Sequence, residues 1–187
     1  MKKQGCDVQN QENDDVTPGE MALKSAILEL VMLASARFTI MPSVASAKWP
    51  DRQLIDDPQR EADMYASLRD QCVEDNIAPE TVLPFLEGLV EAAKQVQHRC
   101  FDLWEEGTCE PDLSEKITAP RNELDTINKA IIELLSRPPF QTCDKDMAQA
   151  LFLELSADLS LTLNDQELID ETIISLIMNG ALKAFLR

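Results

Sequence analysis

Arg37, Lys48 and Arg60 are the residues of this sequence whose type and spacing suggest chemistry, and Glu61 directly follows the last of them. The chain carries 34 Asp and Glu residues against 17 Lys and Arg, a formal net charge of −17. In so acidic a chain, most cations are expected to face solvent as partners of carboxylates. These three lie instead within or beside apolar helical sequence. We therefore predict that they bind a small anionic ligand.

The composition limits the classes of protein and of ligand. With 187 residues, 44% of them hydrophobic, only five Gly and 5% aromatics, the chain is expected to form one all-α domain. The excess of acidic residues leaves no basic stripe, so we expect neither nucleic acid nor a membrane as a partner. The five Cys form no CxxC pair and His98 is the only histidine. We therefore expect no metal site.

The first residues provide no clear targeting signal. Residues 1–20 read as a polar leader that we expect to be disordered, since no apolar run follows its two lysines, and we expect no signal peptide in this sequence. The apolar run 26–36 is interrupted by Glu29 and is too short to span a bilayer, so it reads as a core helix. The odd number of Cys leaves the compartment open.

Hydrophobic periodicity, caps and prolines predict about six helices that position these residues. The predicted spans are about residues 21–41, 58–74, 79–105, 119–137, 144–157 and 164–185. Arg37 lies at the C-terminal end of the first helix, which Pro42 is expected to close, so that Lys48 falls in a loop. Asp57 and Pro58 are favourable residues for starting the second helix, which places Arg60 in its first turn.

These spacings resemble those of the all-helical chorismate mutases. An Arg lies eleven positions before a Lys, that Lys lies nine positions before an Asp, and Asp-x-x-Arg-Glu opens the next helix. Trp49, the run Phe101-Asp102-Leu103-Trp104 and the later Arg121 resemble more narrowly the exported gamma subclass of that family. The resemblance covers about residues 25–130. It implies a chorismate mutase II fold, with a catalytic part over about 21–136 and C-terminal helices over about 143–186.

The resemblance also implies an activity, the cofactor-free conversion of chorismate to prephenate in aromatic amino acid biosynthesis or by a secreted enzyme. It assigns the two substrate carboxylates to Arg37 and Arg121, whose planar guanidinium groups suit carboxylates. Lys48 would contact a carboxylate and the ether oxygen, and Gln97 would donate to that oxygen. A Gln donates at any pH, so we predict little loss of kcat/KM between pH 5 and 8 from this residue.

Three further residues complete the expected substrate site. By the same resemblance, Arg60 supports the substrate, Glu61 accepts a hydrogen bond from its hydroxyl, and Asp57 fixes the substrate or the loop backbone. The residues expected to contribute to catalysis are Arg37, Lys48, Glu61 and Gln97. Each of the seven, taken alone, is more simply explained as a surface or capping residue. Their joint spacing favours a site.

Two positions depart from the family pattern and keep alternatives open. Ala93 stands where the family often has Ser or Thr, and Met64 where a Gln can occur. Each departure removes a possible hydrogen bond, worth roughly 1 kcal/mol. One alternative is an isochorismate pyruvate-lyase-like enzyme, and another is a catalytically silent helical binding module or effector. The family's exported members imply a homodimer and a periplasmic or secreted location, with the cytoplasm as the alternative.

Overall fold

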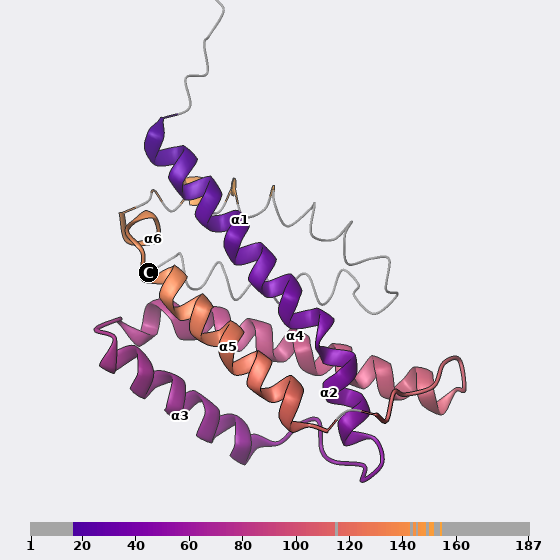
Figure 1. Ribbon diagram of the computed structural model, residues 1–187. Coiled ribbons are helices and arrows are strands. Elements are labelled where there is room, and N and C mark those ends of the chain that lie inside the picture. The colour runs from indigo at the N-terminus through magenta and orange to yellow at the C-terminus, as the bar shows by residue number, and fades with distance from the viewer. Residues whose placement is uncertain are drawn as a thin grey trace, which may run out of the picture.

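The computed structural model describes residues 17–114, 116–142, 144, 146–148, 150, 151 and 154, and these residues contain helices and no strand (Figure 1). The helices are α1 (Pro18–Thr39), α2 (Met41–Lys48), α3 (Pro58–Glu74), α4 (Pro79–Glu105), α5 (Thr118–Leu135) and α6 (Pro138–Thr142). The predicted all-α fold is confirmed. The expectations for residues 1–16, and for most of the C-terminal helices over 143–186, lie outside the described residues.

The N-terminal helix begins earlier than its apolar pattern indicated. The Thr17 hydroxyl accepts from the Glu20 backbone N–H at 3.2 Å, and the Glu20 carboxylate accepts from the Thr17 N–H at 2.6 Å. This reciprocal cap satisfies two backbone donors that the first turn leaves unpaired. With Pro18 at the first position, α1 therefore starts three residues before Met21.

The predicted loop around Lys48 was wrong. Pro42 lies in the first turn of α2, where a missing N–H costs no intrahelical hydrogen bond, so it starts a helix. Ile40, with φ −83° and ψ −21°, joins α1 to α2 almost without interruption. Lys48 is the last residue of α2 and takes its direction from a helix.

The two helices after this junction begin and end close to where the sequence predicted. The Asp57 carboxylate caps α3 by accepting from the Arg60 backbone N–H at 3.1 Å. Helix α4 begins at Pro79, and Gly107, with φ 71°, takes the left-handed conformation just beyond its end. Helix α5 starts at Thr118, one residue before the predicted start.

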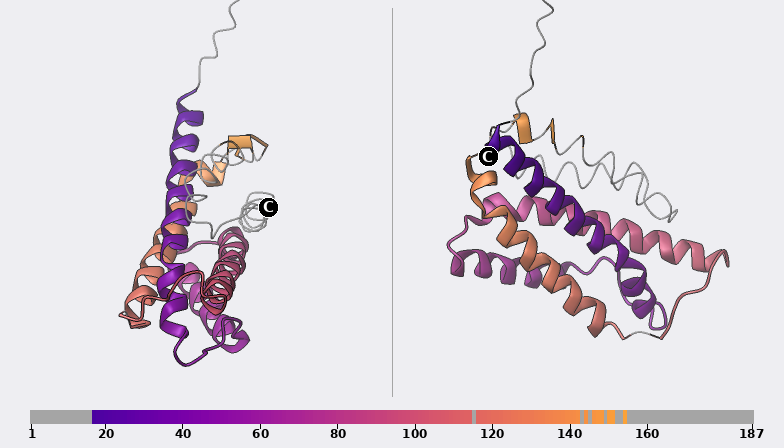
Figure 2. Two further views of the ribbon diagram at one scale, coloured as in Figure 1. Left: turned by 90° about the vertical axis from the view of Figure 1, so that its right-hand side faces the viewer. Right: turned by 45° about the horizontal axis from the view of Figure 1, so that its top comes forward.

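The core lies where α1 packs along α5 and α2 packs along α4 (Figures 1 and 2). Its largest fully buried side chains include Ile27, Leu30, Phe38, Phe85, Leu89 and Ile131. By length and composition alone, the stretch Pro18–Lys48 would suffice to cross a membrane. Because α1 and α2 contribute much of this core, we interpret the stretch as core helix.

An aromatic cluster fixes the chain just after Lys48. The Trp49 ring packs edge-on against Phe101 and Trp104 of α4, with ring centroids 4.9 and 5.3 Å apart. The Arg52 guanidinium lies 3.7 Å from the centroid of the Trp49 ring. Such contacts combine apolar burial with a cation–π attraction. The cluster therefore holds the end of α2 against α4 and limits the movement of Lys48.

Candidate active site

Arg37, in the last turn of α1, carries a charge into the core. It is 5% exposed, and its Nη1 donates to the Asn128 Oδ1 of α5 at 2.6 Å. Its Nε is buried without a partner in the described part of the chain. Burial lowers the pKa of Arg37 to about 10. A buried guanidinium with one neutral partner and one idle donor is poised to bind an anion.

Lys48 projects from the end of α2 and is only 7% exposed. Burial, together with the charges of Arg60 and Arg121, lowers the pKa of the Lys48 ammonium to about 8. Within the described ranges, no carboxylate forms an ion pair with it. The charges of Asp57 and Asp56 offset the cost of burying this ammonium only in part, since the net pKa stays lowered.

Two arginines complete the group of cations. Arg60 comes from the first turn of α3, and Arg121 from the first turn of α5. Burial, and then the charge of Arg60, lowers the pKa of Arg121, whose Nε has no partner among the described residues. Arg37, Lys48, Arg60 and Arg121 are hereafter called the cationic cluster. Four helices bring these positive charges together although like charges repel, and a bound anion would relieve that repulsion.

All the predicted site residues lie around one cavity of about 100 Å³. It is lined by Arg37, Lys48, Asp57, Arg60, Glu61, Gln97 and Arg121, together with Ala93, Lys94, Met64 and several apolar residues. The sequence thus identified a set of residues that the fold brings together from α1, α2, α3, α4 and α5.

A larger cavity of about 510 Å³ adjoins the first. The two cavities share the walls formed by Arg37, Arg60, Met64, Arg121 and Leu124. Asp125 and Asn128 of α5 line the larger one only. Together the two cavities have a volume in the range of small-molecule sites. The three guanidinium groups lie where the cavities meet.

Gln97 presents its amide to the smaller cavity from α4. It is 6% exposed, and its Nε2 donates to the Ala93 carbonyl at 3.2 Å and approaches the Met41 Sδ at 3.7 Å. Its Oε1 is buried without a partner in the described residues. A thioether is a weak acceptor, so a ligand oxygen would replace the Met41 contact at little cost.

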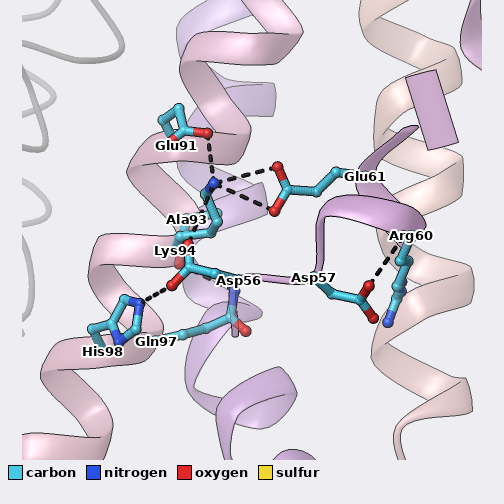
Figure 3. A network of polar contacts seen from close by, with 9 residues as sticks. All are labelled: Asp56, Asp57, Arg60, Glu61, Glu91, Ala93, Lys94, Gln97 and His98. Atoms are coloured by element: carbon cyan, nitrogen blue, oxygen red, sulfur yellow. Dashed lines mark hydrogen bonds and ion pairs between the residues drawn. The ribbon is translucent and has the colours of Figure 1, made fainter. Parts of the chain in front are cut away.

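Lys94 is the lining residue that the sequence did not indicate. Its ammonium lies 3.3 Å from both oxygens of Glu61, 2.6 Å from Glu91 and 3.5 Å from Asp56 (Figure 3). Burial lowers the pKa of Lys94, but the hydrogen bonds that its ammonium donates to Glu91 and Glu61 outweigh that effect, and the net pKa lies above its usual value. The i,i+3 spacing of Glu91 and Lys94 resembles a surface pair, which hid this role.

The described residues contain no group of three His, Cys, Asp or Glu side chains placed to hold a metal ion. The cavity is lined by charged side chains and an amide, which can bind an anion and orient it. They can also stabilise negative charge that develops on a bound oxygen atom.

Comparisons with known proteins show what this chain is similar to. The family profile of chorismate mutase type II matches residues 28–98. A secreted chorismate mutase from Mycolicibacterium smegmatis (strain ATCC 700084 / mc(2)155) is 26% identical over 132 residues, which cover 68% of this chain and 73% of the relative. The crystal structure of chorismate mutase from Burkholderia thailandensis has a similar fold, with a TM-score of 0.69 and 24% identity. That match covers 86% of this chain and 99% of the other.

The class that the fold and the site define is an all-helical protein with a cavity lined by four cations. Over residues 28–98 the chain is similar to the chorismate mutase type II family, and the resemblance predicted from the sequence is confirmed.

Proposed function

We propose that this protein is a chorismate mutase, which converts chorismate to prephenate without a cofactor. The observation that carries the proposal is the cationic cluster. In a chain with twice as many acidic as basic residues, four cations from four helices line one cavity, and two of them, Arg37 and Lys48, are buried. The substrate is a dianion, and its two carboxylates would neutralise part of that charge.

The arginines would bind the substrate in its reactive conformation. Arg37 and Arg121 each have a buried Nε without a partner in the described chain, and Arg37 is held by Asn128. A guanidinium binds a carboxylate through two parallel hydrogen bonds, which fixes orientation as well as position. Holding both carboxylates would bring the two reacting ends of chorismate together and remove part of the entropy cost of the reaction.

Lys48 and Gln97 would act on the bond that breaks. The reaction is a single-step rearrangement in which the ether C–O bond breaks while a C–C bond forms, so no nucleophile is needed. Negative charge grows on the ether oxygen as that bond breaks. An ammonium and an amide N–H beside that oxygen stabilise the transition state more than the ground state.

Glu61, Arg60 and Asp57 would complete the site from the start of α3. The Asp57 cap fixes the first turn of that helix, and both other residues lie in that turn. We propose that Glu61 accepts a hydrogen bond from the substrate hydroxyl and that Arg60 supports the same end of the substrate. All seven residues lie between Arg37 and Arg121, so the catalytic part would lie within about residues 21–136.

We also propose that the protein is a homodimer. Met21, Leu28 and Met32 of α1 are 57%, 47% and 64% exposed, and their spacing places them on one face of the helix. A second copy of the chain would cover this apolar face. Light scattering should give twice the chain mass of 21.0 kDa, and Met32→Glu should give the monomer. A monomeric wild-type protein would refute this part of the proposal.

Export is the proposed location, supported by the name of the secreted relative. Helix α1 carries Arg37 and core residues, so its removal as a signal sequence would destroy the site. Fractionation of the source cells, with an antibody against this chain, would test the location. Protein found only in the cytoplasm would refute it.

The activity is tested by incubating purified protein with chorismate and, in a separate assay, with isochorismate, following the loss of substrate absorbance and identifying the product. Prephenate, converted by acid to phenylpyruvate, is the expected product. Release of pyruvate from isochorismate without prephenate formation would instead favour a lyase. Chorismate left intact by a folded protein would favour a silent binding module.

A further inference from the structure

Lys94 is the centre of a charge network that lies beside the cationic cluster and differs from it. The ammonium contacts Glu91 on its own helix, Glu61 on α3 and Asp56 in the loop before α3, and Asp56 in turn contacts His98 at 2.8 Å (Figure 3). The Lys94 side chain is 13% exposed and that of Glu61 is 24% exposed. Exposed ion pairs contribute little, but a pair this sheltered from water holds its geometry more firmly.

The contact with Glu61 is the one that reaches the pocket. Lys94 Nζ lies 3.3 Å from each Glu61 oxygen, so the ammonium faces the whole carboxylate. Both residues line the cavity. They come from different helices and are 33 positions apart in sequence. The link therefore limits the rotation of the Glu61 side chain relative to α4, which also carries Gln97.

Lys94 itself is poorly suited to bind a substrate carboxylate. An ammonium has three N–H donors, and here three carboxylates surround it. The shortest contact, 2.6 Å, goes to Glu91, and the contacts with Glu61 are longer. Glu61 therefore keeps lone pairs with which to accept a hydrogen bond from a ligand.

We propose that Lys94 is a positioning residue, which holds the Glu61 carboxylate where it accepts a hydrogen bond from the ligand hydroxyl. The site would then select ligands by the ring position of that hydroxyl. This inference rests on the proposed function. Chorismate and isochorismate differ in the ring position of one hydroxyl. A carboxylate held in one position accepts a hydrogen bond from only one of these two hydroxyls, whereas a mobile carboxylate could reach the hydroxyl of either compound.

The test compares two stable oxabicyclic dicarboxylates that mimic the rearranging substrate, one with the ring hydroxyl in the position found in chorismate and one with it in the position found in isochorismate. Calorimetry gives the dissociation constant of each for wild type, Lys94→Met, Glu61→Gln and the double variant. Wild type should prefer the compound with the chorismate-like hydroxyl by about tenfold or more. Lys94→Met should reduce that preference to less than about threefold. In the Glu61→Gln background, Lys94→Met should cause little further change, because Lys94 acts through Glu61.

Two variants make the result specific. Lys94→Arg keeps a cation beside Glu61 and should retain most of the preference. Lys129→Met removes the same charge from an exposed pair with Glu133 on α5 and should change nothing. Circular dichroism and urea unfolding identify any variant that has lost its fold. If Lys94→Met has lost its fold, the preference of Lys94→Arg between the two compounds is compared with that of wild type instead.

Three outcomes would overturn the inference. Equal weakening of the binding of both compounds by Lys94→Met would mark a purely structural role. An equal effect of Lys94→Met in both Glu61 backgrounds would show that Glu61 is not the mediator. An unchanged preference in Lys94→Met would leave the proposed function standing and refute this inference. A wild-type protein that binds neither compound and makes no prephenate refutes the proposed function, and the inference with it.

Discussion

Two lysines line the same cavity, and the protein treats their charges in opposite ways. Lys48 lies among arginines, and its pKa falls to about 8 because burial and like charges both disfavour the ammonium. Lys94 is also sheltered from water, but three carboxylates surround it and its net pKa is raised. The sign of the neighbouring charges decides the difference. One lysine is left ready for an external anion, whereas the other is already neutralised.

The difference between the two lysines separates groups that act on a ligand from groups that hold the site together. A buried cation without an ion-pair partner among the described residues costs stability, so its presence favours an anionic ligand as its partner. A cation with several carboxylate partners stabilises the arrangement around it. Substitutions at the two lysines and at Arg121 should reveal this contrast.

The largest effect is expected for Lys48→Ala, which removes the ammonium proposed to face the ether oxygen. Because that contact strengthens as the bond breaks, kcat for prephenate formation should fall by roughly 10²- to 10³-fold. Steady-state kinetics measures this loss. Lys129→Ala, on the exposed face of α5, is the matched control and should keep wild-type kinetics. A decrease of less than about threefold in Lys48→Ala would remove Lys48 from the mechanism.

Arg121→Ala should act mainly on binding. A guanidinium that holds a carboxylate contributes equally to the bound substrate and to the transition state, so its loss should raise KM by about 10- to 100-fold. The decrease in kcat, measured in the same assay at saturating chorismate, should be smaller than the increase in KM. An unchanged KM would mean that the carboxylate binds elsewhere, as in the larger cavity beside Asp125 and Asn128.

The pH dependence should follow Lys48. Its pKa of about 8 in the free protein means that the ammonium persists below pH 8 and is lost above it. From pH 5 to about 7, kcat/KM should therefore stay nearly flat, and above about pH 8 it should fall about tenfold per unit. A bound dianion favours the ammonium, so the decline in kcat should begin at higher pH. A decline in kcat/KM that begins near pH 5 would contradict both this assignment and the role of Gln97.

Replacing either lysine by Met should change the free energy of unfolding, with opposite signs for Lys48 and Lys94. Lys48→Met removes an unpaired buried cation and should raise the free energy of unfolding by about 1 kcal/mol. Lys94→Met leaves three carboxylates without their shared cation and should lower it by about 1–2 kcal/mol. Urea unfolding monitored by circular dichroism measures both. Changes of the same sign would contradict the distinction between an unpaired Lys48 in the cationic cluster and a paired Lys94 in the charge network.

Sequence patterns predicted those parts of the site that depend on local signals. Asp57 before Pro58 is a helix start, so the place of Arg60 and Glu61 in the first turn of α3 followed directly. The spacing of Arg37 and Lys48 pointed to a shared pocket, and both residues line one. Their roles toward chorismate stay predictions.

Other features depend on signals that are ambiguous or not local. A proline such as Pro42 can end one helix or start the next, and the short α2 became clear only in three dimensions. In the sequence, Lys94 and Glu91 have the i,i+3 spacing of an ordinary surface ion pair, so no local pattern distinguishes Lys94. Its contacts with Glu61 and Asp56 arise only from the packing of α4 against α3 and the preceding loop.

Proton uptake on ligand binding would show directly whether Lys48 faces a bound dianion. The oxabicyclic dicarboxylate with the chorismate-like hydroxyl is titrated into wild type and Lys48→Met at pH 8, in two buffers of different ionisation enthalpy. We expect one ligand per chain, with uptake of about half a proton that disappears in Lys48→Met, because half of Lys48 is deprotonated before binding. Binding with equal affinity and equal proton uptake in both proteins, or no binding to wild type, would contradict the account.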